Sequence, residues 1–205
     1  MKTTLYLVRH AQSHPSYLLN HSEWPLSSIG EKQAAKLADL LIPLNIETIY
    51  VSPYARCLQT MEPFSTKTGI PVAIKDDLRE RLISKELINN FAHVWRKSWE
   101  DFHFALPGCE TSANAQDRFV STMVEISRVD AGRVVGVSTH GNVMGLFLNF
   151  VDPTAGMSDT DNLSNPDVVR VISDGGAFSW DRDFKLSGLD GIATDHLDTP
   201  IEKKR

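Results

Sequence analysis

The stretch LYLVRHAQS, from Leu5 to Ser13, places an arginine and a histidine directly after four apolar residues. This apolar run has the length and the β-forming side chains of a short buried strand, which we expect over residues 4–8. Side chains that can carry positive charge are poor core residues, and a strand end holds them in fixed positions. Arg9 and His10 are therefore candidates for a functional site, provided that other parts of the chain join them.

Strand-like and helix-like segments alternate along the rest of the chain, which favours an α/β fold with a mostly parallel sheet. Ser27 or Ser28 can cap the first helix, and Ser52-Pro53 is a favourable start for the second. Pro63 is expected to kink or end that second helix. The other expected strands cover residues 48–51, 69–74 and 133–137, with a terminal hairpin at 168–172 and 177–180. The expected helices cover residues 28–41, 53–60, 87–104, 112–126 and 143–150.

Three motifs follow three of the expected parallel strands. The pair RH follows the first strand, SPYAR follows the second, and STHG follows the late one. Ligands of open α/β sheets bind beyond the carboxyl ends of the strands, so these motifs should meet at one edge. We expect that edge to bring together Arg9, His10, Arg56 and His140.

Two guanidinium groups and two imidazoles around one point would form a pocket for an anion. The planar fork of arginine offers paired hydrogen bonds to phosphate, and fixed cations stabilise the charge that phosphoryl transfer spreads over oxygen atoms. A neutral imidazole can attack phosphorus and form phosphohistidine. Glu80, in LRERL, is our first choice for the acid that protonates the leaving oxygen, and Glu110 is the second.

The order and spacing of these motifs resemble the histidine phosphatase superfamily, whose fold is described as phosphoglycerate mutase-like. The resemblance runs from about Tyr6 to Gly141 and rests on LVRHAQS, PLSSIG, SPYARCLQT, PGCETSA and STHG. It implies a three-layer α/β/α fold with a mostly parallel sheet, and an enzyme of the phosphatase branch that needs no metal or other cofactor. It also implies roles for particular residues. His10 would be the nucleophile, Glu80 the proton donor, and the phosphate would be held by Arg9, Arg56 and His140.

The chain departs from the family pattern after the Arg-His pair. The family usually has Gly-Glu there, whereas this chain has Ala11-Gln12. A backbone carbonyl at Ala11 can still accept a proton from the histidine ring, so the nucleophile is not in doubt. The asparagine that often helps to hold the phosphate has no clear counterpart, and Ser13 and Ser16 are the polar groups at hand. We expect Gln12 and Ser16 to take part in phosphate binding.

The same pocket is compatible with three functions. The first is a phosphomonoester hydrolase that works through phospho-His10. The second is a mutase, because Glu80-Arg81 resembles the mutase branch, although Leu82-Ile83-Ser84 replaces the His-Tyr-Gly that follows there. The third is a protein that binds phosphorylated ligands without turnover. The substrate itself, a small phosphorylated molecule in the first interpretation, is not identified by these residues.

Composition excludes several other classes of protein. The 205 residues, 41% of them hydrophobic and 23% charged, suit one globular domain over residues 1–205. A net charge of −5 argues against a nucleic-acid-binding protein. The apolar run before Arg9 is too short for a membrane span or a signal peptide, so we expect a cytoplasmic protein without membrane contact. Cys57 and Cys109 suggest no disulfide framework, and the histidines lack the spacing of metal ligands.

Two segments have uncertain roles. Residues 82–106 contain Trp95-Arg96-Lys97-Ser98-Trp99, which is either an amphipathic helix packed on the core or a lid whose cations meet the substrate. This segment could equally form an interface, so a homodimer is one option for the oligomeric state. Residues 186–205 are polar with a basic end, and we expect a poorly ordered tail.

Overall fold

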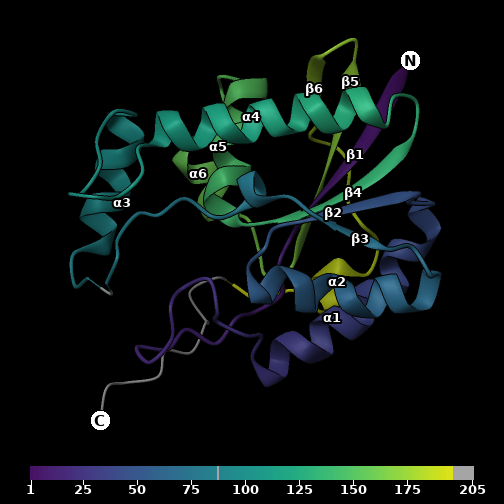
Figure 1. Ribbon diagram of the computed structural model, residues 1–205, viewed down its shortest axis with the longest axis horizontal. Coiled ribbons are helices and arrows are strands. Elements are labelled where there is room, and N and C mark those ends of the chain that lie inside the picture. Colours follow the sequence, from purple (N-terminus) through teal and green to yellow (C-terminus); the bar gives the residue numbers. More distant parts are fainter. Residues whose placement is uncertain (87, 196–205) are drawn as a thin grey trace.

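The computed structural model of the chain describes residues 1–86 and 88–195. Within these ranges a six-stranded sheet has the order β3-β2-β4-β1-β5-β6 (Figure 1). The strands are β1 (Lys2–Arg9), β2 (Thr48–Val51), β3 (Val72–Ile74), β4 (Val134–Thr139), β5 (Asp167–Asp174) and β6 (Ala177–Asp181). The first four strands pair in parallel, whereas β5 and β6 form the predicted hairpin and add to β1 in antiparallel fashion. The mostly parallel sheet is therefore confirmed.

Helices cover both faces of the sheet, which confirms the three layers (Figure 1). Along β1, Leu5 and Leu7 point into the core beneath one helix layer, and Tyr6 and Val8 point into the core of the other, as the two-residue period of a strand requires. One layer consists of α1 (Ser28–Leu41) and α2 (Ala55–Thr68), and the other of α4 (Ser112–Val129) and α5 (Gly141–Val151). The carboxyl ends of β1, β2 and β4 lie at one edge of the sheet, which is where ligands of such sheets bind.

Two further helices lie outside these layers. Helix α3 (Phe91–Glu100) stands to one side of the sheet in Figure 1, and α6 (Met157–Asp161) follows α5. Helical structure was expected over 87–104, but α3 is shorter at both ends, and Leu87 lies outside the described residues. Short 3-10 turns complete the described secondary structure at Ile42–Leu44, Asp76–Leu78 and Leu189–Gly191.

The second helix differs from its sequence-based prediction at both ends. Helix α2 begins at Ala55 and not at Pro53, because Tyr54 has an extended backbone, with φ −70° and ψ 136°. The helix then continues through Pro63 to Thr68. Pro63 was expected to kink or end the helix, and the predicted end is wrong. Phe64, directly after the proline, is 1% exposed, and its burial offsets the missing backbone hydrogen bond.

The start of the predicted tail is packed on the domain. Leu186 and Leu189 are both buried and join the core that contains Tyr6 and Val8. The Thr194 N–H also donates to the Asn165 carbonyl oxygen at 2.9 Å. The expectation of a poorly ordered tail is therefore wrong for residues 186–195, and residues 196–205 lie outside the described part of the chain.

Candidate active site

The structure brings together the four residues that the motifs predicted. Arg9 ends β1, His10 follows it, Arg56 lies in the first turn of α2, and His140 precedes α5. The Nε of Arg56 lies 3.1 Å from Nε2 of His10, and the rings of His10 and His140 are 5.3 Å apart between centroids. They meet because β2, β4 and β1 are adjacent and parallel, so their carboxyl ends share one edge.

The geometry around His10 defines its tautomer. The His10 Nδ1 lies 2.7 Å from the Ala11 carbonyl oxygen, which can only accept, so Nδ1 carries the proton. The Nε2 atom then has a free lone pair, which accepts the hydrogen bond from Arg56 Nε. Burial and the charges of Arg56 and Arg9 hold the pKa of His10 well below its usual range. His10 is therefore a neutral imidazole near neutral pH, with its lone pair on Nε2.

Burial of the two site histidines should make stability depend on pH. The pKa values of His10 and His140 are both held well below 6.5, mainly by burial. When the pH falls below about 6.5, the unfolded chain takes up protons that the folded protein does not. The free energy of unfolding should therefore fall by up to about 1.4 kcal/mol per pH unit for each ring. Urea unfolding at pH 7.5, 6.5 and 5.5 measures this slope, and His10→Gln should show a shallower one. An equal slope in both proteins would contradict the lowered pKa of His10.

The two arginines are held by backbone groups as well as by the site. Arg9 Nη1 donates to the Leu163 carbonyl oxygen, and Arg56 Nη1 donates to the His21 carbonyl oxygen at 2.6 Å. The Arg56 guanidinium also lies over the Tyr54 ring, 4.9 Å from its centroid. Burial lowers the pKa of Arg9 to about 10, which still leaves it charged at neutral pH. Both cations are thus fixed in place before any substrate arrives.

Glycine at position 141 is required by a close approach. A Cβ built on Gly141 would lie 3.0 Å from Cζ of Arg9, closer than a side chain tolerates without a shift of the guanidinium. The glycine in STHG therefore lets Arg9 pack against the start of α5. The glycine of STHG and the position of the Arg9 guanidinium thus depend on each other.

Glu80 lies at the N-terminus of α5, beside His140. Its carboxylate accepts hydrogen bonds from the backbone N–H groups of Asn142 and Val143, each at 3.1 Å. The partial positive charge of a helix N-terminus suits a carboxylate there. Its rival Glu110 is engaged elsewhere, because Arg118 donates to both of its oxygens at 2.7 and 2.8 Å. Of the two carboxyl groups, Glu80 is therefore the one at the start of α5, and its backbone hydrogen bonds stabilise its ionised form.

The other two proposed phosphate ligands have contacts within their own loop. The Gln12 side-chain oxygen accepts from the Ser27 hydroxyl at 2.6 Å, and Ser27 in turn caps α1. Ser16 Oγ accepts from the Leu18 N–H at 3.1 Å. Both side chains are buried. These contacts give Gln12 and Ser16 a part in holding the loop, and their binding of phosphate stays a prediction.

The site also contains residues that sequence reasoning missed. Asn165 Nδ2 donates to the His10 carbonyl oxygen at 2.9 Å, and Thr60 Oγ1 accepts from the Ala11 N–H at 3.0 Å. Ser52 contacts His140, with 2.7 Å between Oγ and Nε2. Ser52 and Thr60 belong to the stretch SPYARCLQT, so that motif carried a signal for them. Asn165 lies 155 residues from His10, and the sequence held no signal for it.

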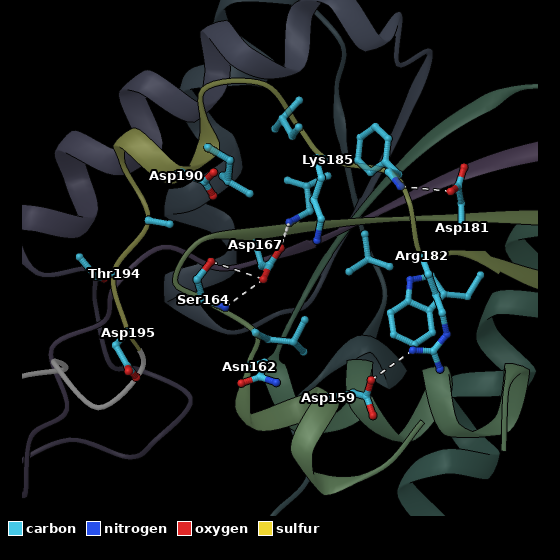
Figure 2. A pocket seen from close by; sticks show the side chains of 18 residues that line it. Asp159, Asn162, Ser164, Asp167, Asp181, Arg182, Lys185, Asp190, Thr194 and Asp195 are labelled. Carbon is cyan, nitrogen blue, oxygen red and sulfur yellow. Dashed lines mark hydrogen bonds and ion pairs between the residues drawn. The ribbon is translucent and has the colours of Figure 1, made fainter. Parts of the chain in front are cut away.

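A cavity of about 570 Å³ lies next to this site but is not lined by any of the predicted site residues (Figure 2). Its lining includes Asn162, Asp167, Arg182 and Lys185. Leu163, whose carbonyl oxygen accepts a hydrogen bond from Arg9, also lines this cavity. Among the described residues, no cluster of histidine, cysteine or carboxylate side chains could hold a metal ion. No helix in the described ranges could span a membrane.

Comparison with known proteins gives a family match over most of the chain. A sequence model of the histidine phosphatase superfamily (branch 1) matches residues 5–182. A probable phosphatase of Schizosaccharomyces pombe is 33% identical over 82 residues, which are 38% of this chain and 39% of that protein. The chain thus aligns with well under half the length of this curated relative.

Solved structures share the fold at low sequence identity. The Bacillus stearothermophilus protein YhfR has a TM-score of 0.74 at 22% identity, with 91% of this chain and 99% of that chain covered. A phosphoglycerate mutase from Bacillus anthracis has a TM-score of 0.72 at 17% identity, with 93% and 96% covered. Likeness at such identities shows the fold and does not choose between reactions.

Proposed function

Because the chain belongs to the histidine phosphatase superfamily (branch 1), we propose that it hydrolyses phosphomonoesters through a phosphohistidine on His10. The observation that carries this proposal is the state of the His10 ring. Its Nδ1 proton is held by the Ala11 carbonyl oxygen, and its Nε2 lone pair faces the Arg56 guanidinium. A neutral ring with a directed lone pair beside a cation is what attack on a phosphate dianion requires.

In the first step, His10 Nε2 attacks phosphorus and the bond to the leaving oxygen breaks. The hydrogen bond from Arg56 Nε to His10 Nε2 is exchanged for one to a phosphoryl oxygen, since both use the same donor. Arg9, Arg56 and His140 stabilise the charge on the equatorial oxygens. Glu80, in its protonated form, gives its proton to the leaving oxygen, so that an alcohol departs.

In the second step, water attacks the phosphorus of phospho-His10. Glu80, now a carboxylate, takes a proton from this water, and the bond between nitrogen and phosphorus breaks. Inorganic phosphate leaves and His10 returns to its neutral state. The proposed steps use no metal, because the two guanidinium groups supply the positive charge.

The role of Glu80 predicts an effect that depends on the leaving group. Glu80→Gln should slow hydrolysis of an alkyl phosphate by about 10²- to 10³-fold, because its alkoxide needs a proton. Hydrolysis of p-nitrophenyl phosphate, whose leaving group needs little protonation, should suffer much less in the first step. The kcat/KM values for both substrates, which report only the steps up to formation of phospho-His10, measure the difference, with Glu110→Gln as the control. An equal loss on both substrates in the first step would contradict the role of Glu80 as the acid.

The mutase alternative has less support from the geometry. Arg81, which follows Glu80 as in the mutase branch, donates to the backbone carbonyl oxygens of Glu110 and Phe104 and is 3% exposed. Its Nε and Nη2 are therefore engaged within the protein, and its burial leaves little surface for a second anionic group of the substrate, although Nη1 has no hydrogen-bond partner among the described residues. Conversion of 3-phosphoglycerate to 2-phosphoglycerate with a bisphosphate primer would favour the mutase. Tight phosphate binding without release would favour the non-catalytic alternative.

We further propose that residues 82–106 form a lid on a single domain that acts in the cytoplasm. Helix α3 joins α6 through a hydrogen bond of 2.9 Å from Trp95 Nε1 to Asp161. Phe91, Trp95 and Trp99 form a row of ring contacts along α3 that runs from the exposed Phe91 to Trp99 at the core. The lid and the packed cover helix are thus compatible interpretations of the same segment.

A further inference from the structure

Ser52 lies behind His140 and contacts only one of its two ring nitrogens. The Ser52 Oγ lies 2.7 Å from His140 Nε2, and both residues are fully buried. The same oxygen accepts a hydrogen bond from the Tyr54 N–H at 3.3 Å. A hydroxyl that already accepts from a backbone N–H can still donate its own proton. Ser52 is thus able to donate to His140.

The valence of the imidazole decides which atom can meet a phosphate. Each ring nitrogen makes one hydrogen bond in the ring plane, and Ser52 occupies the position at Nε2. The contact with a phosphoryl oxygen must therefore come from Nδ1. Burial, with the Arg56 charge, keeps the pKa of His140 well below its usual range, so the free ring carries one proton. The oxygens of a phosphate dianion only accept hydrogen bonds. His140 can therefore donate to one of them only if Nδ1 carries the proton of the ring.

We propose that Ser52 is a positioning residue that fixes the Nδ1–H tautomer of His140 by donating its hydroxyl proton to Nε2. The chain of donors then runs from the Tyr54 N–H to Ser52 Oγ, from the Ser52 hydroxyl to His140 Nε2, and from His140 Nδ1–H to the phosphoryl oxygen. The last link rests on the proposed phosphatase function, whereas the tautomer is a property of the free protein. Ser52 acts through His140 and does not touch the substrate.

The neighbouring thiol of Cys57 does not provide the same control. Its sulfur lies 3.4 Å from His140 Nε2 and 3.8 Å from His140 Nδ1, but it also lies 3.4 Å from the Thr139 carbonyl oxygen, to which the thiol donates. Burial raises the pKa of Cys57 to about 12, so the thiol keeps its proton and donates it in the hydrogen bond to that carbonyl oxygen. Sulfur is a weak acceptor as well. Ser52 is the stronger partner of the ring.

The test compares Ser52→Ala, Ser52→Thr and Ser138→Ala. Ser138 is fully buried, its carbonyl oxygen accepts from the Ser52 N–H, and its hydroxyl interacts with the Cys57 sulfur and not with His140, so its loss is a matched control. Ser52→Ala should lower kcat on an aryl phosphate by about 10- to 100-fold and weaken competitive inhibition by inorganic phosphate. Ser52→Thr keeps the hydroxyl and should recover most of this loss, and Ser138→Ala should match the wild type.

Nitrogen-15 NMR of labelled histidine gives the readout that a merely structural role would not move. In the wild type at neutral pH, His140 should show a protonated Nδ1 and an unprotonated Nε2, with and without inorganic phosphate. In Ser52→Ala this pattern should shift toward the other tautomer. A wild-type His140 protonated on Nε2, or an unchanged tautomer in Ser52→Ala, would overturn the inference even if the variant folds poorly. Failure of the phosphatase proposal would appear separately, as turnover in His10→Ala, and would leave the tautomer result unaffected.

Discussion

Replacement of His10 by alanine is expected to lower the rate of phosphate release from p-nitrophenyl phosphate by at least about 10⁴-fold. Alanine removes Nε2, the proposed nucleophile, which accepts a hydrogen bond from Arg56 Nε. The remaining Arg9, Arg56 and His140 can still bind phosphate but cannot form a covalent intermediate. Release of p-nitrophenol, followed continuously, measures the loss.

The control for this variant is its fold. His10→Ala should retain the wild-type circular dichroism spectrum and should still bind inorganic phosphate, because three ligands of the pocket remain. The buried ring leaves a cavity, so some loss of stability of about 2–4 kcal/mol is expected. Turnover within tenfold of the wild type, in a folded variant, would falsify the assignment of His10.

Arg56→Ala is expected to have the second largest effect, a loss of about 10²- to 10³-fold in kcat/KM. Arg56 supplies a charged donor that is directed at the reacting nitrogen of His10 and stabilised by the Tyr54 ring and the His21 carbonyl oxygen. Its loss should reduce kcat more than it raises KM, because charge on the equatorial oxygens is most concentrated in the transition state. Arg56→Lys should recover only part of the activity, since a lysine lacks the planar fork.

The same variant should also shift the pH profile. The charge of Arg56 is one cause of the lowered pKa of His10, so its removal should raise that pKa and move the acid limb of the profile to higher pH. Arg182→Ala is a suitable control, because Arg182 pairs with Asp152 and Asp159 on the surface. If Arg56→Ala and Arg182→Ala have the same pH profile and the same kcat/KM, the proposed role of Arg56 beside His10 is contradicted.

Much of the site was predictable because the parallel strands impose its geometry. Once Arg9, Arg56 and His140 were each placed after a strand of one sheet, the common edge followed from topology alone. The roles of these residues were inferred from the chemistry of guanidinium and imidazole groups and from the resemblance to the family, and they stay predictions. The tautomer of His10 also follows from sequence order, because its partner is the carbonyl of the next residue.

What the sequence could not predict depends on packing between distant segments. Pro63 reads locally as a helix stop, yet the burial of Phe64 carries α2 beyond it. Leu186 and Leu189 stand in a polar stretch, and only the groove that they fill gives them a place in the core. Asn165 reaches His10 from the start of the terminal hairpin, and no local pattern marks that contact.

Rapid-quench labelling with a phosphorus-32 aryl phosphate tests the central claim most directly. The account predicts a burst of covalent label that reaches the enzyme concentration or a fraction of it, stable in base and lost in acid, and mapped to the peptide that contains His10. His10→Ala should show no such label under the same conditions. Wild-type turnover without any trapped phosphoenzyme, or a label on a residue other than His10, would contradict the account.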